Sequence, residues 1–260
     1  MKPIKLSKAR QLSISVLAVA VVFGLWAFFT YPGLIRPFFL PSPTTVGRSI
    51  IKLFSEFDLL TDIAVSVFRI VLGFSLACII SVPLGILTGL SKKAAAFFDP
   101  IVGFVRYIPP SAFVPLFILW FGIGNLEKVL IIFAGVVSFL TILIFDVVSN
   151  IKKEFTEAAL TLGAKPKEVV FKVIIPQALP GIWDAMRAMI GAAWTYLVVA
   201  EMVASTSGLG HLIITSQRFL QTPNVIAAIL VIGAIGLLTN YLFKAGHRIL
   251  FPWTGKSEHA

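Results

Sequence analysis

The sequence KKEFTEAALTLGAKPKEVVFKVIIP, residues 152–176, concentrates charge within a very apolar chain, and long hydrophobic runs lie on both sides of it. Pro166 suits the first position of a helix, and Gly163 suits the residue just after a helix end. The stretch therefore predicts two short helices, roughly 153–162 and 166–175. A helix–glycine–helix unit in this place is equally compatible with a docking surface for a soluble partner and with an ordinary loop between two membrane spans.

The whole chain has the composition of a membrane protein. Of its 260 residues, 58% are hydrophobic and 13% are charged, with a mean hydropathy of +0.95, whereas soluble domains carry about 25% charged residues. The excess of 22 Lys and Arg over 12 Asp and Glu gives a net charge of +10. Membrane proteins gather Lys and Arg in cytoplasmic loops, so this charge predicts no nucleic-acid partner. The single cysteine, Cys78, excludes an internal disulfide, and the three distant histidines predict no metal site.

Six apolar runs predict an all-α membrane protein with six transmembrane helices in one domain, residues 1–260. The predicted spans are approximately 12–30, 63–90, 101–121, 128–149, 182–204 and 224–248. The first run contains Ala18-Val19-Ala20, which resembles a signal-peptide cleavage site, but its length of about 20 residues favours a retained span. A helix near 44–57 is expected to be amphipathic, with its apolar residues at helical spacing: Val46, Ile50, Ile51 and Phe54.

Prolines interrupt the third run. In RYIPPSAFVPLFILWFG, residues 106–122, three prolines within seven residues remove backbone hydrogen-bond donors. The helix is therefore expected to bend or open there, which membrane-embedded backbone tolerates only inside protein or beside a cavity. The candidates for lining a pathway in this segment are Arg106, Tyr107, Pro109 and Ser111. Arg106 is expected either to attract an anion or to extend to the cytoplasmic headgroups.

Other polar and aromatic residues inside the predicted spans are further candidates for a functional role. Arg69, near the outer end of its span, is expected to extend to the headgroups. Glu201 is expected either to shape an outer gate or to hydrogen-bond the loop at residues 205–210. Trp194 and Tyr196 are pathway candidates, although packing is the commoner role of aromatic residues in the middle of a span.

The distribution of basic residues predicts the orientation. With six spans, both termini and the 152–180 loop lie on one side, which receives fourteen Lys and Arg, whereas the other side receives five. The positive-inside rule therefore places the N- and C-termini and this loop in the cytoplasm.

The sequence contains no catalytic constellation. It has no H-E-x-x-H motif, no G-x-S-x-G motif and no pair of acids suited to a pocket. Gly255-Lys256-Ser257 resembles the end of a phosphate-binding loop, but Leu250 stands where that loop requires glycine. We expect a protein that is not an enzyme and that binds no ATP or other cofactor itself.

The charged stretch resembles the EAA loop of the membrane subunits of ABC importers. The matching residues are Glu157-Ala158-Ala159, Gly163, Val173, Ile175 and Pro176. Two further segments, Arg106–Gly122 and Ala200–Gly210 (AEMVASTSGLG), extend the resemblance to the nitrate, sulfonate, taurine and bicarbonate group of permeases, over roughly residues 15–250.

The resemblance implies a type I ABC importer permease in the bilayer of the bacterial plasma (inner) membrane. Its implied partners are a second copy of this chain, two ATP-binding subunits that hold ATP and Mg, and an extracytoplasmic substrate-binding protein. In that family the loop forms coupling helices that sit in a groove of the ATPase. The residues expected to couple to it are Glu157, Ala158, Ala159, Gly163, Ala164, Lys165 and Pro176.

Two alternatives remain. A transporter or channel driven by an ion gradient is the competing class, and the resemblance to a coupling loop argues against it. The expected substrate is a small anionic nutrient, but relatives in the family also carry uncharged or cationic nutrients, and specificity there resides largely in the binding protein.

Overall fold

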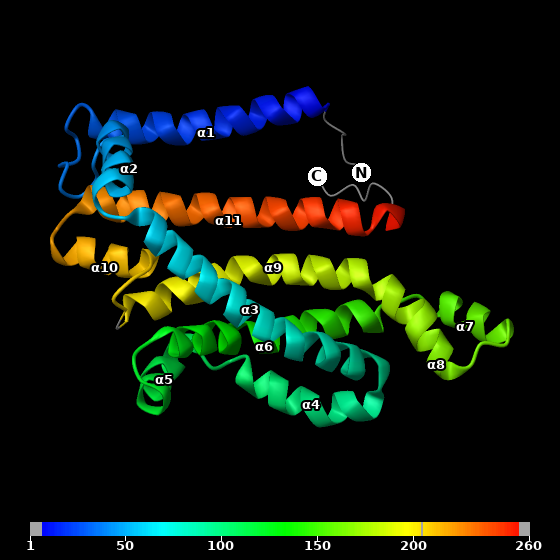
Figure 1. Cartoon of the computed structure of the whole chain (residues 1–260). Coiled ribbons are helices and arrows are strands. Elements are labelled where there is room, and N and C mark those ends of the chain that lie inside the picture. Colours follow the sequence, from blue (N-terminus) through cyan, green and yellow to red (C-terminus); the bar gives the residue numbers. More distant parts are fainter. Residues whose placement is uncertain (1–6, 204, 255–260) are drawn as a thin grey trace. The chain divides into compact units, whose positions relative to one another are not determined.

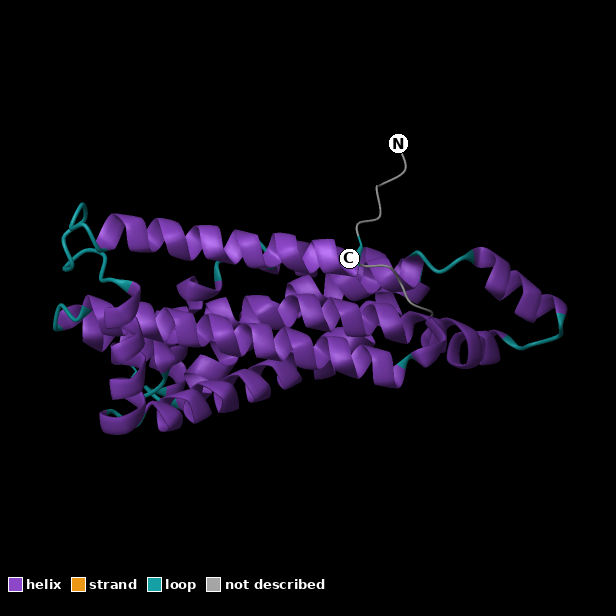
Figure 2. Cartoon of the chain, turned by 90° about the horizontal axis from the view of Figure 1, so that it is seen from above, coloured by secondary structure: helices purple, strands orange, loops and turns teal. Residues whose placement is uncertain are grey.

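The computed structural model describes residues 7–203 and 205–254, and these residues form helices and no strands (Figures 1 and 2). The long helices are α1 (Lys8–Thr30), α3 (Leu59–Leu90), α6 (Asn125–Ser149), α9 (Ile175–Met202) and α11 (Thr222–Leu250). The shorter α-helices are α2 (Pro43–Glu56), α4 (Lys92–Val105), α5 (Val114–Phe121), α7 (Lys153–Thr161), α8 (Pro166–Val169) and α10 (Leu209–Arg218). Two 3-10 turns, Pro110–Phe113 and Pro252–Thr254, and a π-helical segment, Val170–Ile174, complete the described elements.

The chain divides into two compact units. The first holds the described residues as far as Leu60, together with Leu212–Val231. The second holds Thr61–His211 and the described residues from Ile232 onward, and it contains every candidate site residue named above.

In the first unit, side chains tie the loop after α1 to its neighbours. Trp26 Nε1 donates to the Pro41 carbonyl oxygen at 2.9 Å, and Thr222 Oγ1 donates to the Phe38 carbonyl oxygen at 2.7 Å. The predicted amphipathic helix is present as α2, in which Val46 and Leu53 are buried, whereas Ile51 and Phe54 are exposed. A helical face repeats at intervals of three and four residues, so the face centred on Val46 and Leu53 does not include those two.

In the second unit, α3 packs closely on α6 because glycine recurs along one side of α3. A Cβ built on Gly73 would lie 2.8 Å from Ile132 Cβ, and one on Gly85 would lie 2.7 Å from Ile144 Cβ. Side chains in these places would force the helices apart. Small residues allow such close approach between helices in lipid, where dispersion contacts replace the hydrophobic effect.

Five described helices are long and apolar enough to cross a membrane: Leu12–Thr30, Leu59–Leu90, Asn125–Ser149, Pro166–Met202 and Thr222–Leu250. The predicted break in the third run is confirmed, since Lys92–Val105 and Pro110–Phe121 are separate helices bent by 80°. The all-α prediction is confirmed, and the described residues hold five spans, or six if the bent pair forms one.

One predicted boundary was wrong. The helix beginning at Pro166 does not end near residue 175 but continues through the π-helical segment into α9, so Pro176 and Pro180 lie within helix. The wider π turns end at Ile174, where the hydrogen-bond register changes, just before Pro176, which has no N–H to donate. The result is one continuous helical rod, Pro166–Met202.

Candidate functional site

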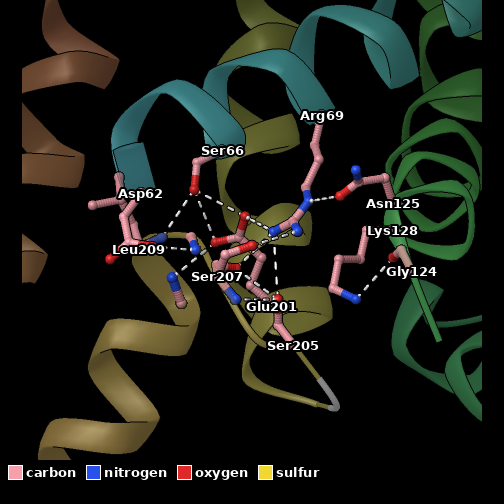
Figure 3. Close-up of polar contacts among 12 residues, drawn as sticks. Asp62, Ser66, Arg69, Gly124, Asn125, Lys128, Glu201, Ser205, Ser207 and Leu209 are labelled. Atoms are coloured by element: carbon pink, nitrogen blue, oxygen red, sulfur yellow. Dashed lines mark hydrogen bonds and ion pairs between the residues drawn. The ribbon is translucent and has the colours of Figure 1, made fainter. Parts of the chain in front are cut away.

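Arg69 lies at the centre of a buried polar cluster between α3, α6, α9 and the loop that follows α9 (Figure 3). We call Asp62, Ser66, Arg69, Asn125, Glu201, Ser205 and Ser207 the Arg69 cluster. Its guanidinium donates from Nη1 to Glu201 Oε1 at 2.7 Å and to the Ser207 carbonyl oxygen at 2.8 Å, and from Nε to Asn125 Oδ1 at 2.9 Å. Nη2 donates to Ser207 Oγ at 3.2 Å.

The expectation that Arg69 extends to the headgroups is therefore wrong. The residue is only 3% exposed, and each guanidinium nitrogen has an acceptor. Nearby acceptors and an opposite charge offset the cost of removing a cation from water, so the side chain stays inside the protein.

Glu201 is fully buried and accepts hydrogen bonds from three directions. Besides Arg69, the donors are Ser66 Oγ, at 2.9 and 3.0 Å from the two carboxylate oxygens, and the Gly210 N–H, at 2.8 Å from Oε2. The expected hydrogen bond between Glu201 and the loop at 205–210 is thus confirmed. The carboxylate links α3, α9 and the start of α10.

The N-terminus of α10 is capped entirely by residues of other helices. The Gly208 N–H donates to Asp62 Oδ1 at 2.6 Å, and the Leu209 N–H donates to Ser66 Oγ at 2.9 Å. The first N–H groups of a helix have no partner within it, and α3 and α9 supply the acceptors here. Two features require glycine at position 208: its φ of +103°, and the Glu201 carboxylate, which a Cβ there would meet.

A second buried pair lies beside the cluster at the start of α6. Lys128 Nζ donates to Glu127 Oε2 at 3.0 Å and to the Gly124 carbonyl oxygen at 3.0 Å, and both charged side chains are buried. Lys128 is one of the five basic residues that the orientation count assigned to the outer side, and its side chain is buried rather than in solvent.

Arg106 has a different environment at the end of α4. Its Nη2 donates to Tyr107 Oη at 2.7 Å, and its Cζ lies 4.7 Å from the centroid of the Tyr107 ring. Arg106 Nε is buried and has no hydrogen-bond partner among the described residues. Pro109 and Ser111, the other candidates in this break, are exposed.

The two aromatic candidates of α9 pack against protein. Trp194 is buried in the core. Tyr196 lies so close to Gly135 of α6 that a Cβ there would meet its ring. A role for either residue in lining a pathway stays a prediction.

The charged stretch forms a helical hairpin of α7 and α8 that extends beyond the ends of α6 and α9 (Figure 1). α7 ends in a Schellman turn: the Ala164 N–H donates to the Ala159 carbonyl oxygen at 3.0 Å, and the Gly163 N–H to the Leu160 carbonyl oxygen at 2.9 Å. Gly163 has φ +86°, as this turn requires. The Lys165 N–H then donates to Glu168 Oε2 at 2.9 Å, which caps α8.

The surface of this hairpin is exposed and partly apolar. Glu157, Ala158, Gly163 and Lys165 are exposed, whereas Ala159, Ala164 and Pro176 are half-buried. Leu162 is 88% exposed at the tip, and Phe155, Leu160 and Phe171 are also exposed. Apolar side chains held out by charged short helices indicate a surface for a protein partner.

Sequence reasoning missed the partnership of Arg69 with Glu201, because 132 residues separate them. One signal was present: two opposite charges stand near the same predicted end of two apolar runs. Asp62 and Asn125 carried no signal, since Asp62 acts on the loop after α9 and Asn125 on Arg69 of another helix.

The long apolar helices define a multi-pass membrane protein. The fold is similar to that of the MetNI methionine ABC transporter in inward-facing conformations, with a TM-score of 0.65 and 19% identity, over 74% of this chain and 95% of that chain. Residues 81–256 match the binding-protein-dependent transport system inner membrane component family, and the chain belongs to this family.

The curated relatives are ABC permeases. The chain is 34% identical to the taurine transport system permease protein TauC of Escherichia coli (strain K12), over 96% of this chain and 93% of that protein. It is 33% identical to the putative aliphatic sulfonates transport permease protein SsuC of Bacillus subtilis (strain 168), over 94% and 88%. It is 31% identical to the bicarbonate transport system permease protein CmpB of Synechococcus elongatus, over 91% and 90%.

The resemblance to this group of ABC permeases is thereby confirmed. The chain is a multi-pass protein of the bacterial plasma membrane, and its relatives are transport subunits.

Proposed function

We propose that this chain is the pathway-forming subunit of an ATP-driven importer for a small anionic nutrient, with a sulfonate as the preferred class. It works as a homodimer with two ATP-binding subunits and an extracytoplasmic substrate-binding protein. Similarity to taurine, sulfonate and bicarbonate permeases supports the substrate class. ATP and Mg belong to the partner subunits, and the termini and the hairpin face the cytoplasm.

The α7–α8 hairpin is the observation that carries this proposal. Glu157 and Lys165 stand exposed on either side of the Gly163 turn, and Leu162 lies at its tip. We assign this face to the ATPase, with the apolar side chains buried on docking and Glu157 and Lys165 at the rim.

The helical rod Pro166–Met202 offers a route for coupling. One end lies in the hairpin, and the other carries Glu201 within the Arg69 cluster. At about 1.5 Å of rise per residue, the 26 steps from Ile175 to Glu201 span about 40 Å, enough to cross a bilayer. Closure of the ATPase dimer would shift the rod, and the shift would displace the loop at the outer end of the rod. Glu201, which is bonded to that loop, is therefore a candidate for controlling the outer gate. Arg106, Tyr107, Pro109, Ser111, Trp194 and Tyr196 remain the proposed lining of the pathway.

Copurification tests the proposal. The tagged chain, extracted from its native membrane, is expected to bring an ATPase with it, and ATP-loaded vesicles of the complex are expected to take up substrate. Recovery of the chain alone, with uptake that persists without ATP, would replace the proposal with transport driven by an ion gradient.

The Gly163 turn gives a sharper test. Gly163→Asp, and more mildly Gly163→Ala, strains the left-handed residue and should lower ATP-driven uptake by about 5- to 150-fold, the usual range of coupling between sites. Gly33→Ala is the matched control, because Gly33 also has a positive φ, +77°, and open space around it, but lies far from the hairpin in sequence. Equal uptake in the Gly163 and Gly33 variants would contradict the assignment of the hairpin.

A further inference from the structure

A cavity of about 240 Å³ is lined by residues of α3, α4 and α6, close to the end of α3 at Leu90 and the end of α6 at Ser149. Its charged and hydroxyl-bearing lining residues are Thr88, Asp99, Arg106, Thr141 and Asp146. The volume is below the range of about 300–1,000 Å³ typical of drug-sized ligands, so the cavity suits a small solute.

The charged groups of this cavity are not paired with one another. Neither Asp99 nor Asp146 forms a salt bridge with Arg106 or any other cation among the described residues. Arg106 Nε likewise has no partner among these residues. Charges that stand unpaired beside an open cavity are available to a ligand, whereas charges that serve only the fold are normally paired.

The two threonines add acceptors rather than donors. Thr88 Oγ1 donates its proton to the Leu84 carbonyl oxygen at 2.9 Å, and Thr141 Oγ1 donates to the Val137 carbonyl oxygen at 2.7 Å. Each hydroxyl oxygen keeps lone pairs that can accept a hydrogen bond. Two carboxylates and two hydroxyl oxygens therefore face a ligand as acceptors, and Arg106 faces it as the donor.

This pattern matches a molecule that carries both charges. An ammonium group has three donors and no acceptor, which suits the carboxylates and hydroxyl oxygens, and an anionic head suits the planar guanidinium. A simple anion would meet two carboxylates of like charge, and a simple amine would leave Arg106 unpaired.

We propose that this cavity is an inner binding site for a small zwitterion with an ammonium group and a sulfonate group. The inference rests on the proposed function for the choice of sulfonate. It narrows the substrate class from sulfonates in general to amino-substituted sulfonates, which carry no net charge.

Direct binding tests the site. The purified full-length chain in lipid nanodiscs, without ATPase or binding protein, is titrated with 2-aminoethanesulfonate, ethanesulfonate and ethylamine. We expect the aminosulfonate to bind at least tenfold more tightly than either single-charge probe, about 1.4 kcal/mol. Equal binding of the three probes, or tighter binding of ethanesulfonate, would overturn the proposal.

Variants assign the two halves of the site. Asp146→Asn and Asp99→Asn should weaken binding of the aminosulfonate without weakening that of ethanesulfonate, whereas Arg106→Gln should weaken both. Asp184→Asn is the control, since this carboxylate pairs with Arg187 at 3.5 Å and lies outside the cavity. Unchanged binding of the aminosulfonate in all three cavity variants would refute the site.

The readout separates this inference from the proposed function. If the selectivity is found but no ATPase copurifies, the site stands and the importer assignment fails. If ATP-driven uptake is found but the three probes bind alike, the importer stands and the site fails.

Discussion

Arg69 and Arg106 lie in the same compact unit and have opposite surroundings. Arg69 is 3% exposed, and its guanidinium donates to a carboxylate, an amide oxygen and a loop carbonyl oxygen. Arg106 is half-buried, and its side-chain hydrogen bond within the described residues goes to Tyr107. Its buried Nε has no acceptor among these residues. Both carboxylates near Arg106 stand unpaired as well, among the residues that the structure describes.

The same two helices connect these regions. Arg69 and Thr88 are both on α3, about 28 Å apart at 1.5 Å per residue, and Asn125 and Asp146 are both on α6, about 32 Å apart. At one end of the α3–α6 pair, charged side chains bind the loop after α9. At the other end, charged side chains line a cavity without partners among the described residues. The contrast shows that the partners of an arginine, rather than its position along a helix, distinguish a structural side chain from one that is available to a ligand.

Removing the guanidinium from the Arg69 cluster should have the largest effect. Arg69→Met leaves the Glu201 carboxylate buried and uncompensated, which we expect to lower the free energy of unfolding by about 3–5 kcal/mol. The measurement is equilibrium unfolding of the purified chain in detergent. The double variant Arg69→Met with Glu201→Gln should recover part of the loss, because no charge then stays buried. A change below about 0.5 kcal/mol in the single variant would show that the cluster does not hold the fold.

Gly208→Ala should have an intermediate effect on the same cluster. The left-handed φ of +103° and the nearby Glu201 carboxylate oppose a Cβ, so we expect a loss of about 1–3 kcal/mol in the same unfolding measurement. Gly47→Ala is the matched control, since Gly47 lies within α2 with open space around it, and alanine there should be neutral or stabilising. Equal stability of both variants would contradict the geometry of the loop.

Arg106→Gln should have the smallest effect on stability. The side chain has few partners to lose, so we expect a change within about 0.5 kcal/mol, together with the weaker sulfonate binding described above. Unfolding and ligand titration on one preparation give both numbers. A loss as large as that of Arg69→Met would remove the contrast between the two arginines.

Local features were readable from the sequence. The Gly163 turn, the start of α8 at Pro166 and the break in the third run each depend on the backbone chemistry of glycine or proline, which acts within a few residues. The family followed from one such segment, because the spacing of Glu157, Gly163 and Pro176 is local as well.

Features that depend on distant partners were misjudged. Arg69 was expected at the headgroups from its place near the outer end of a span, but it pairs with Glu201. The helix that begins at Pro166 was expected to end near residue 175, but the helical run continues to Met202. Similarly, the acceptor groups around Arg106 come from three helices, and no spacing within one helix reveals them.

The sequence alone determined that this chain is an all-α membrane protein, because hydropathy, proline and glycine act through local backbone and solvation energies, and its resemblance to the EAA loop pointed to the ABC permease group. The tertiary structure decided which charges are satisfied. Electrostatic pairing acts through space, so the packing of α3, α6 and α9 turned Arg69 and Glu201 into a buried link and left Arg106, Asp99 and Asp146 beside a cavity.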